Sequence, residues 1–98
     1  MKKWHNESTA QLYRAILALR TEEECSAFLE DLCTIKEILG MSQRLEVAKM
    51  LRSGASYTAI TKATGASTAT ISRVSKCCEY GTGGYRTVIA RLQGEDKE

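Results

Sequence analysis

The sequence contains no proline, and its apolar residues recur at helical rather than strand spacing. Proline is the residue that most strongly breaks a helix, so nothing of that kind interrupts helices in this chain. Leu12, Ile16 and Leu19 repeat at i, i+4 and i+7, which places them in one stripe along a helix. The alternation of apolar and polar residues that is typical of a half-buried strand is missing from the sequence. These observations predict an all-α fold.

Capping residues and glycines indicate where the helices begin and end. Thr21 followed by Glu24 has the spacing of a capping box, in which the hydroxyl and the carboxylate each accept a hydrogen bond from a backbone N–H. The apolar stretch 34–39 is predicted to be a short connector that ends at Gly40, after which Ser42 is a suitable N-cap for the third helix. The predicted helices cover residues 6–20, 22–33, 43–52, 57–64, 68–79 and 85–93.

The chain length of 98 residues suffices for one domain and not for two. We therefore expect a single domain that spans 1–98. Its parts are N-terminal dimerisation helices at 6–53, a helix-turn-helix at 56–79, a C-terminal helix at 85–93 and a charged, disordered tail at 94–98.

The first two predicted helices are hydrophobic on nearly two sides. Leu17 follows Ile16 directly, and Leu29 follows Phe28 in the same way. Because a chain of this length buries only about two-thirds of its unfolded surface by itself, one side has no partner within the chain. We expect that side to pack across the axis of a homodimer; a compact monomeric bundle is the alternative.

The composition excludes several classes of protein. Hydrophobic residues make up 43% of the chain and charged residues 27%, which is typical of a folded protein and not of a disordered or membrane protein. No apolar stretch approaches the roughly 18–20 residues of a membrane-spanning helix, and the N-terminus lacks the apolar core of a signal peptide. We expect a cytoplasmic protein without a membrane partner, associated with the nucleoid if it binds DNA.

The cysteines do not have the spacing of a metal site. No C-x-x-C pair occurs, and the single histidine, His5, lies far from the cysteines near the N-terminus. Cys25 and Cys33 fall on or near an apolar stripe and are expected to be small buried hydrophobes. Oxidation of the adjacent pair Cys77 and Cys78 stays open as an alternative role.

The strongest functional pattern is the spacing around Gly65. In a helix-turn-helix, the turn needs a residue that tolerates an unusual backbone, and glycine does so without strain. Ile60 lies five residues before this glycine, while Ile71 and Val74 lie six and nine residues after it. At these positions the two helices of the motif touch each other and the core. The spacing predicts a helix-turn-helix over residues 57–76.

The second helix of this motif carries short, hydroxyl-rich side chains at its start. Such side chains let a helix approach base edges in the major groove, where hydroxyls can donate or accept. A run of Ser and Thr is also a poor helix-forming surface, which favours a functional explanation over a merely solvated helical hairpin. We expect base contacts from Thr68, Ala69, Ser72 and Arg73, and phosphate contacts from Ser67, Lys62, Lys76 and Thr58.

The charges are divided unevenly along the chain. Residues 1–40 hold five Lys and Arg against seven Asp and Glu, whereas residues 41–93 hold eight against two. The basic excess of the second part suits a surface that meets a polyanion such as DNA. An uneven surface charge without functional meaning is the alternative.

Four segments of the sequence resemble a known family. Residues 57–60 (YTAI) and 65–74 (GASTATISRV) resemble the Trp repressor superfamily. Residues 31–38 (DLCTIKEI) and 42–48 (SQRLEVA) are similar to its YerC/YecD branch, and the similarity spans residues 8–92. The resemblance implies a six-helix fold and an intertwined homodimer. It also implies two helix-turn-helix segments that meet successive major grooves of a palindromic operator in double-stranded DNA.

The resemblance also implies where an effector would bind. Trp repressor uses tryptophan as its corepressor, with the indole held between two arginines. One of these arginines matches Arg73. The second falls near Gln43 and Arg44, and a hydroxyl ligand of the amino group aligns with Cys77. The position after the first arginine is Gly in the repressor and Val74 here, so the pocket is matched only in part. The candidate effector pocket therefore consists of Arg73, Arg44 and Cys77. No cofactor is expected, and tryptophan control is the alternative.

Together these features predict a sequence-specific DNA-binding transcriptional regulator, a repressor that binds a palindromic operator as a homodimer. A dimeric protein-interaction module that has the same fold without DNA binding is the alternative from another class. An enzyme is not expected, because the chain has one histidine, no paired carboxylates near a Gly-rich loop and no nucleophile beside a base.

Overall fold

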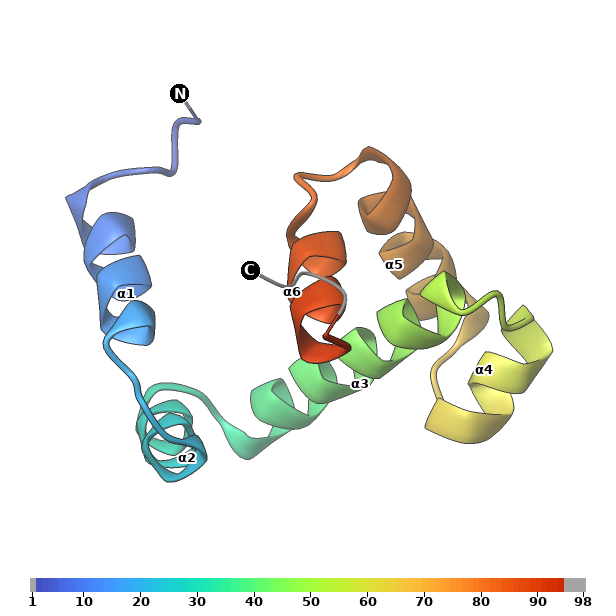
Figure 1. The fold of residues 1–98 in the computed structure, drawn as a ribbon, viewed down its shortest axis with the longest axis horizontal. Helices are drawn as coiled ribbons and strands as arrows, with labels where there is room; N and C mark the ends of the chain where they lie inside the picture. The colour runs from blue at the N-terminus through green and yellow to red at the C-terminus, as the bar shows by residue number, and fades with distance from the viewer. Residues whose placement is uncertain (1, 95–98) are drawn as a thin grey trace. The chain divides into compact units, whose positions relative to one another are not determined.

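The computed structural model describes residues 2–94, and its regular secondary structure is helical (Figure 1). The helices are α1 (Glu7–Leu17), α2 (Glu22–Leu32), α3 (Ile35–Arg52), α4 (Tyr57–Thr64), α5 (Thr68–Tyr80) and α6 (Gly84–Leu92). The prediction of an all-α fold with six helices is confirmed, and no strand occurs in the described residues. None of the described helices is long and apolar enough to cross a membrane. From residue 95 onward, the predicted disordered tail lies outside the described residues.

The first two helices begin at side-chain caps. Asn6 and Thr9 form a capping box at α1, in which each side chain accepts a hydrogen bond from the backbone N–H of the other, at 2.9 and 3.0 Å. At α2, Thr21 Oγ1 accepts from the Glu24 N–H at 3.0 Å, as the sequence predicts. The Glu24 carboxylate reaches one residue further back than expected and accepts from the Arg20 N–H at 2.8 Å. α1 ends at Leu17 with Ala18 as its C-cap, three residues before the predicted end at residue 20.

The predicted connector at 34–39 is wrong, because these residues form the first turns of one long helix. Thr34 Oγ1 accepts from the Glu37 N–H at 3.0 Å, and Glu37 Oε1 accepts from the Thr34 N–H at 2.8 Å. This capping box starts α3 eight residues before the predicted third helix. Gly40 does not have a positive φ and does not end a helix. Ser42 is likewise an interior residue of α3 and not the predicted N-cap.

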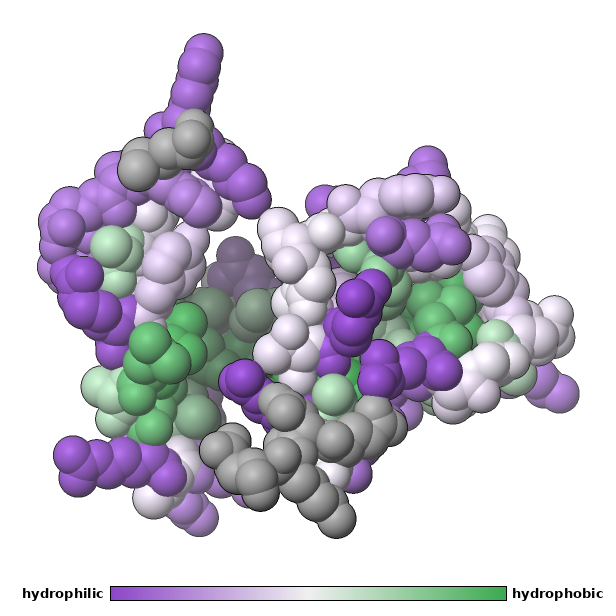
Figure 2. All heavy atoms as spheres, turned by 45° about the horizontal axis from the view of Figure 1, so that its top comes forward, coloured by the Kyte–Doolittle hydropathy of each residue, from purple (hydrophilic) through white to green (hydrophobic). Residues whose placement is uncertain are grey.

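The chain divides into two compact units between Ile38 and Leu39. The first unit contains α1, α2 and the first turn of α3, and no residue of α1 or α2 is buried. Its apolar side chains include Leu17, which is 82% exposed, and Ile35, which is 74% exposed. Figure 2 shows apolar surface open on this unit. The first unit therefore has no buried core of its own among the described residues.

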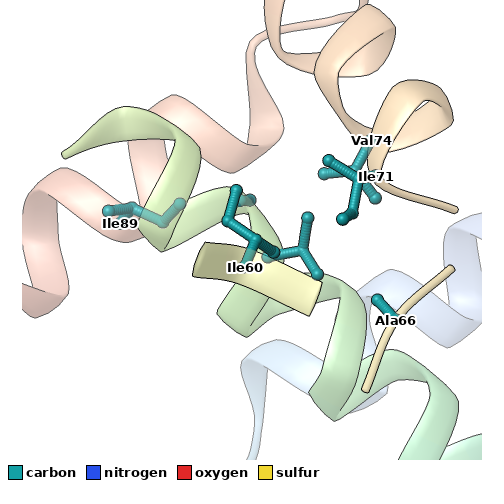
Figure 3. Close-up of a cluster of buried hydrophobic side chains, with 7 residues drawn as sticks. Ile60, Ala66, Ile71, Val74 and Ile89 are labelled. Carbon is teal, nitrogen blue, oxygen red and sulfur yellow. The ribbon is translucent and has the colours of Figure 1, made fainter. Parts of the chain in front are cut away.

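The buried core of the described residues lies in the second unit (Figure 3). Its side chains come from α3, α4, α5, α6 and the turn between α4 and α5, and they are Val47, Ala48, Ile60, Ala66, Ile71, Val74 and Ile89. Full burial of one Val or Ile side chain stabilises a fold by about 1.5–3 kcal/mol. This cluster holds α4 and α5 against α3 and so positions the candidate site.

Candidate nucleic-acid interface

α4 begins with a side-chain cap and ends at a left-handed glycine. Ser56 Oγ accepts a hydrogen bond from the Ala59 N–H at 3.1 Å. At the other end, Gly65 has a φ of 76°, and its N–H donates to the Thr61 carbonyl at 2.8 Å. Residues with a Cβ are strained at this φ, so glycine allows the chain to turn here. The predicted role of Gly65 in the turn is confirmed.

The hydroxyl of Thr64 makes two hydrogen bonds to the backbone on either side of the turn. Its Oγ1 donates to the Ile60 carbonyl at 2.8 Å and accepts from the Ala66 N–H at 3.1 Å. Ala66 is also part of the buried core, with 2% of its surface exposed, which the sequence analysis missed. A small apolar residue directly after the turn glycine is the signal that could have indicated its burial.

The apolar positions predicted from the spacing lie where the helices meet. Ile60 and Ile71 have no exposed surface, and Val74 is 2% exposed. Ile60 comes from α4 and the other two from α5, and all three belong to the cluster drawn in Figure 3. One side of α5 is therefore anchored in the core.

The predicted base-contacting residues share the opposite side of α5. They are Thr68, Ala69, Ser72 and Arg73. At 100° per residue, these four positions fall within one arc of the helix, away from the arc of Ile71 and Val74. Ser72 is half-buried and the other three side chains are exposed. The structure brings the four side chains onto one accessible helix face.

The Ser67 hydroxyl, expected to contact phosphate, is used as the cap of α5. Ser67 Oγ accepts from the Thr70 N–H at 3.1 Å and donates to Thr70 Oγ1 at 3.2 Å. The Ile71 N–H donates to the Ser67 carbonyl at 3.0 Å and forms the first main-chain turn of the helix. The N–H groups of Thr68 and Ala69 precede that turn, at the positive end of the helix dipole. A phosphate at this end would therefore meet backbone donors rather than the serine side chain.

The remaining predicted phosphate contacts are exposed on both helices of the motif. Thr58 and Lys62 lie on α4, and Lys76 lies on α5. Neither lysine has an ion pair within residues 2–94. No acidic residue occurs in α4, and Glu79, near the end of α5, is the first one after it. The charge carried by α4 and the first turns of α5 is therefore cationic throughout.

The three residues of the candidate effector pocket occupy different surroundings. Cys77 lines a cavity of about 540 Å³ together with apolar residues of α3 and α6, among them Leu45. Arg44 and Arg73 are both exposed, and neither lines this cavity. Arg44 Nη1 instead lies 3.4 Å from the place that a Cβ on Gly40 would take, one turn back along α3. The structure thus brings Cys77 to a cavity without bringing the two arginines to it.

All four cysteines are free thiols. Cys25 and Cys33 are half-buried, so the expectation of small buried hydrophobes is met only in part. Burial raises the pKa of the Cys78 thiol, and the neighbouring Cys77 and Glu79 raise it further. In the part of the chain that the structure describes, no group of three or more His, Cys, Asp or Glu side chains could hold a metal ion.

A residue that the sequence analysis did not assign to the interface connects the motif to α3. Gln43 Nε2 donates a hydrogen bond to the main-chain oxygen of Thr64 at 3.1 Å, across 21 positions of the sequence. Both residues are half-buried. No periodicity or motif indicates this pair, because a polar contact between distant residues leaves no local pattern.

The chain matches a family model described as Trp repressor protein over residues 7–93. It is 48% identical over 96 residues to the uncharacterized protein YerC of Bacillus subtilis (strain 168), a match that covers 98% of this chain and 92% of that protein. The crystal structure of a TrpR-like protein from Eubacterium eligens is 50% identical, with a TM-score of 0.90 and coverage of 97% of this chain and 98% of that chain. A candidate Trp repressor from Staphylococcus aureus is 43% identical, also with a TM-score of 0.90, and the match covers 97% of this chain and 95% of that chain.

These matches extend over nearly the whole chain and over all six helices of the structure. The resemblance found in the sequence and the Trp-repressor-like fold that it implied are confirmed. The chain belongs to the Trp repressor family, whose members are regulators and not enzymes, as the sequence led us to expect.

Proposed function

We propose that this chain is a sequence-specific DNA-binding transcriptional regulator, a repressor that binds a palindromic operator as a homodimer. One observation carries the proposal: α5 is anchored in the core on one side and presents Thr68, Ala69 and Arg73 on the other. A helix with short exposed side chains on its free side is shaped to enter a major groove. Membership in the Trp repressor family supports the same function.

The first two turns of α5 read the bases in this proposal. The methyl groups of Thr68 and Ala69 can contact the methyl group of thymine, and the hydroxyls of Thr68 and Ser72 can donate or accept at base edges. The planar guanidinium of Arg73 can donate to both acceptors of a guanine or to a phosphate. These four residues therefore determine which operator is bound.

Phosphate contacts supply affinity and orientation. Lys62 and Lys76 are exposed and form no ion pair with another described residue, and Thr58 lies in the first turn of α4. At the start of α5, the uncharged backbone N–H groups that precede the first turn can donate hydrogen bonds to a further phosphate. Because cations that neutralise phosphates release counterions, DNA affinity falls steeply as salt concentration rises.

The exposed apolar surface of the first unit supports a homodimer. No residue of α1 or α2 is buried, although both helices carry apolar stripes. In this proposal the whole chain, 1–98, is one domain. The helices of 6–53 are completed by the partner, 56–79 forms the DNA-binding motif and 85–93 closes the core. The midpoint of thermal unfolding should then rise with protein concentration. A midpoint independent of concentration, together with a monomeric mass in sedimentation, would contradict the dimer.

We propose further that the regulator does not require tryptophan. Val74 is 2% exposed and fills core volume at the position where Trp repressor has glycine, and neither Arg44 nor Arg73 lines the cavity beside Cys77. A tryptophan-responsive repressor is the second candidate, favoured by the match at Arg73. Calorimetry with tryptophan separates the two: no heat of binding is expected, and tight binding would establish tryptophan control.

Selection of bound duplexes from a random pool, followed by genomic footprinting, tests the function directly. The double substitution Thr68→Ala and Ser72→Ala should lower affinity for the selected duplex at least tenfold, because base contacts contribute about 1–3 kcal/mol each. Affinity for an unrelated duplex should not change. Thr87→Ala on α6 is the matched control, since this threonine is exposed outside the motif.

Two outcomes would contradict the proposal. Unchanged selectivity in the double variant would show that α5 does not read the bases. No affinity for DNA at any salt concentration would favour the protein-interaction module.

In the proposed role, the protein acts in the cytoplasm on the nucleoid.

A further inference from the structure

The α4–α5 pair is tied to α3 by a directional bond as well as by apolar packing. Gln43 Nε2, on α3, donates to the Thr64 carbonyl at 3.1 Å. Thr64 is the last residue of α4, and carbonyls at a helix end lack partners within the helix. The side chain of Gln43 therefore holds α4 at the point where the chain turns toward α5.

The other polar contacts of the turn are local. Bonds from the Gly65 N–H to Thr61, from the Thr64 hydroxyl to Ile60, and from the Ala66 N–H to Thr64 all join residues within 60–66. They set the internal geometry of the turn, but they do not set its orientation against α3. The apolar contacts among Ile60, Ile71 and the α3 residues of the core are not directional. The bond from Gln43 supplies the direction that these contacts lack.

Packing does not replace this bond on the side where it lies. A cleft of about 400 Å³ opens there between α3 and α4. Its lining includes both partners of the bond, and its other residues are Leu39, Ser42, Glu46 and Ala63. Because the cleft is open, loss of the bond leaves room for the end of α4 to shift.

A shift of this kind would reach the DNA-contacting residues. α5 begins only three residues after Gly65, and Ile71 and Val74 pack it into the same cluster as α4. The two helices therefore move together, and a displacement at Thr64 is passed to Thr68 at the start of α5.

We infer that Gln43 is a positioning residue for operator recognition: its bond to Thr64 presets the α4–α5 pair for the major groove without a bound small molecule. The inference rests on the proposed DNA-binding function. It assigns to an intrachain hydrogen bond the task of orienting the motif, and it predicts that the protein binds its operator constitutively.

Two substitutions of similar side-chain length test the bond. Gln43→Met keeps the length and removes the donor, and Gln43→Glu places a carboxylate against the Thr64 carbonyl. Ser42→Ala is the matched control, because Ser42 lines the same cleft and its side chain makes no hydrogen bond with any residue of 2–94. Amide hydrogen exchange without DNA reports directly whether the bond from Gln43 stabilises the turn. Exchange of the backbone amides of Gly65 and Ala66 should be faster in both variants and unchanged in the control.

Binding measurements then separate positioning from a general structural role. Affinity for the duplex selected by the wild type should fall about tenfold in Gln43→Met, as expected for one lost hydrogen bond, and further in Gln43→Glu. Affinity for an unrelated duplex and the salt dependence of binding should stay close to those of the wild type, and the melting midpoint of Gln43→Met should fall by only a few degrees, as expected for one lost hydrogen bond. Lys62→Gln provides the contrast, since the dimer loses one phosphate contact from each subunit and the salt slope should fall by about 1.8 for both duplexes.

Failure of the role proposed for Gln43 can be distinguished from failure of the proposed DNA binding. If the wild type selects no duplex, DNA binding fails, and the exchange measurement still decides whether Gln43 holds the turn. Unchanged exchange in both variants would overturn the inference, as would an equal loss of affinity for both duplexes. It would also be overturned if dialysed wild-type protein bound its duplex only after a low-molecular-weight cell fraction was added.

Discussion

Replacement of two glycines by alanine should change stability in opposite directions. Gly40 lies inside α3 with an ordinary helical backbone, although the sequence predicts a connector that ends there. Gly65 ends α4 with a φ of 76°, in the left-handed region. The pair therefore tests two structural assignments with one chemical change, the addition of a methyl group.

The magnitudes follow from the surroundings of each added Cβ. At Gly40 the nearest atom is Arg44 Nη1 at 3.4 Å, the far end of a flexible exposed side chain that can move aside. Alanine is about 0.5–1 kcal/mol better than glycine in a helix interior, so Gly40→Ala should stabilise by about that amount. At Gly65 no atom lies within 4 Å of the added Cβ, and only the left-handed backbone opposes it. Gly65→Ala should therefore destabilise by about 1–2 kcal/mol.

Urea unfolding followed by circular dichroism, at one protein concentration for all variants, measures both effects. Gly54→Ala is the control for backbone strain, because Gly54 has a φ of 89° and likewise no atom within 4 Å of an added Cβ. It should lose about as much stability as Gly65→Ala. A loss of stability in Gly40→Ala would refute the continuous α3, since alanine would then occupy a break. A neutral Gly65→Ala would refute the left-handed turn.

Two further predictions concern the core and a thiol. Ile71→Ala should lower the free energy of unfolding by about 2–5 kcal/mol, because Ile71 has no exposed surface, and a urea midpoint within error of the wild type would contradict its burial. Cys78 should react with an alkylating agent more slowly in the folded protein than in urea, since burial raises the pKa of its thiol, and equal rates by peptide mass spectrometry would contradict this. Because that pKa is higher in the folded state, the associated stability is present below the ordinary pKa of a thiol and is lost as pH rises through the raised value.

The pair α4 and α5 with the turn between them could be predicted from sequence because its constraints are local. A glycine at the turn and apolar residues at fixed offsets describe two helices that must cross closely, and the structure places Ile60, Ile71 and Val74 in the core as the spacing indicates. The N-caps Ser56 and Ser67 are also where their helices begin. All five residues lie within one segment of 19 residues, so no long-range information was needed.

The start of α3 was predicted eight residues too late, because two other residues were interpreted as its boundary. Gly40 was predicted to end a connector and Ser42 to cap the helix after it, because glycine is typical of turns and serine of N-caps. Thr34 and Glu37 carry the same capping-box spacing as the pair at α2, and this earlier box starts the helix. Glycine is tolerated at position 40 because its cost of about 1 kcal/mol is small against the gain from a continuous 18-residue helix.

Contacts between distant residues set the limit of the sequence analysis at the site. The exposed face of α5 follows from periodicity alone, since the buried positions leave only one free arc. The bond from Gln43 to Thr64 joins residues 21 positions apart, and each of them separately is an ordinary polar residue of a helix. The same limit applies to Arg44 and Arg73, whose alignment with a ligand pocket does not determine what lies beside them in this chain.

The residues of α5 divide between two tasks, and this division explains how a helix with a poor composition can be stable. Ser and Thr at exposed positions have low helix propensity because their hydroxyls compete for backbone groups. At the start of α5 the Ser67 hydroxyl accepts a hydrogen bond from the Thr70 N–H and so caps the helix. Burial of Ile71 and Val74 stabilises the opposite side of the helix. Each buried side chain contributes more than several unfavourable propensities subtract. If the proposed function holds, the exposed positions can therefore be adapted to contact DNA, and substitutions there should change DNA recognition with little effect on the fold.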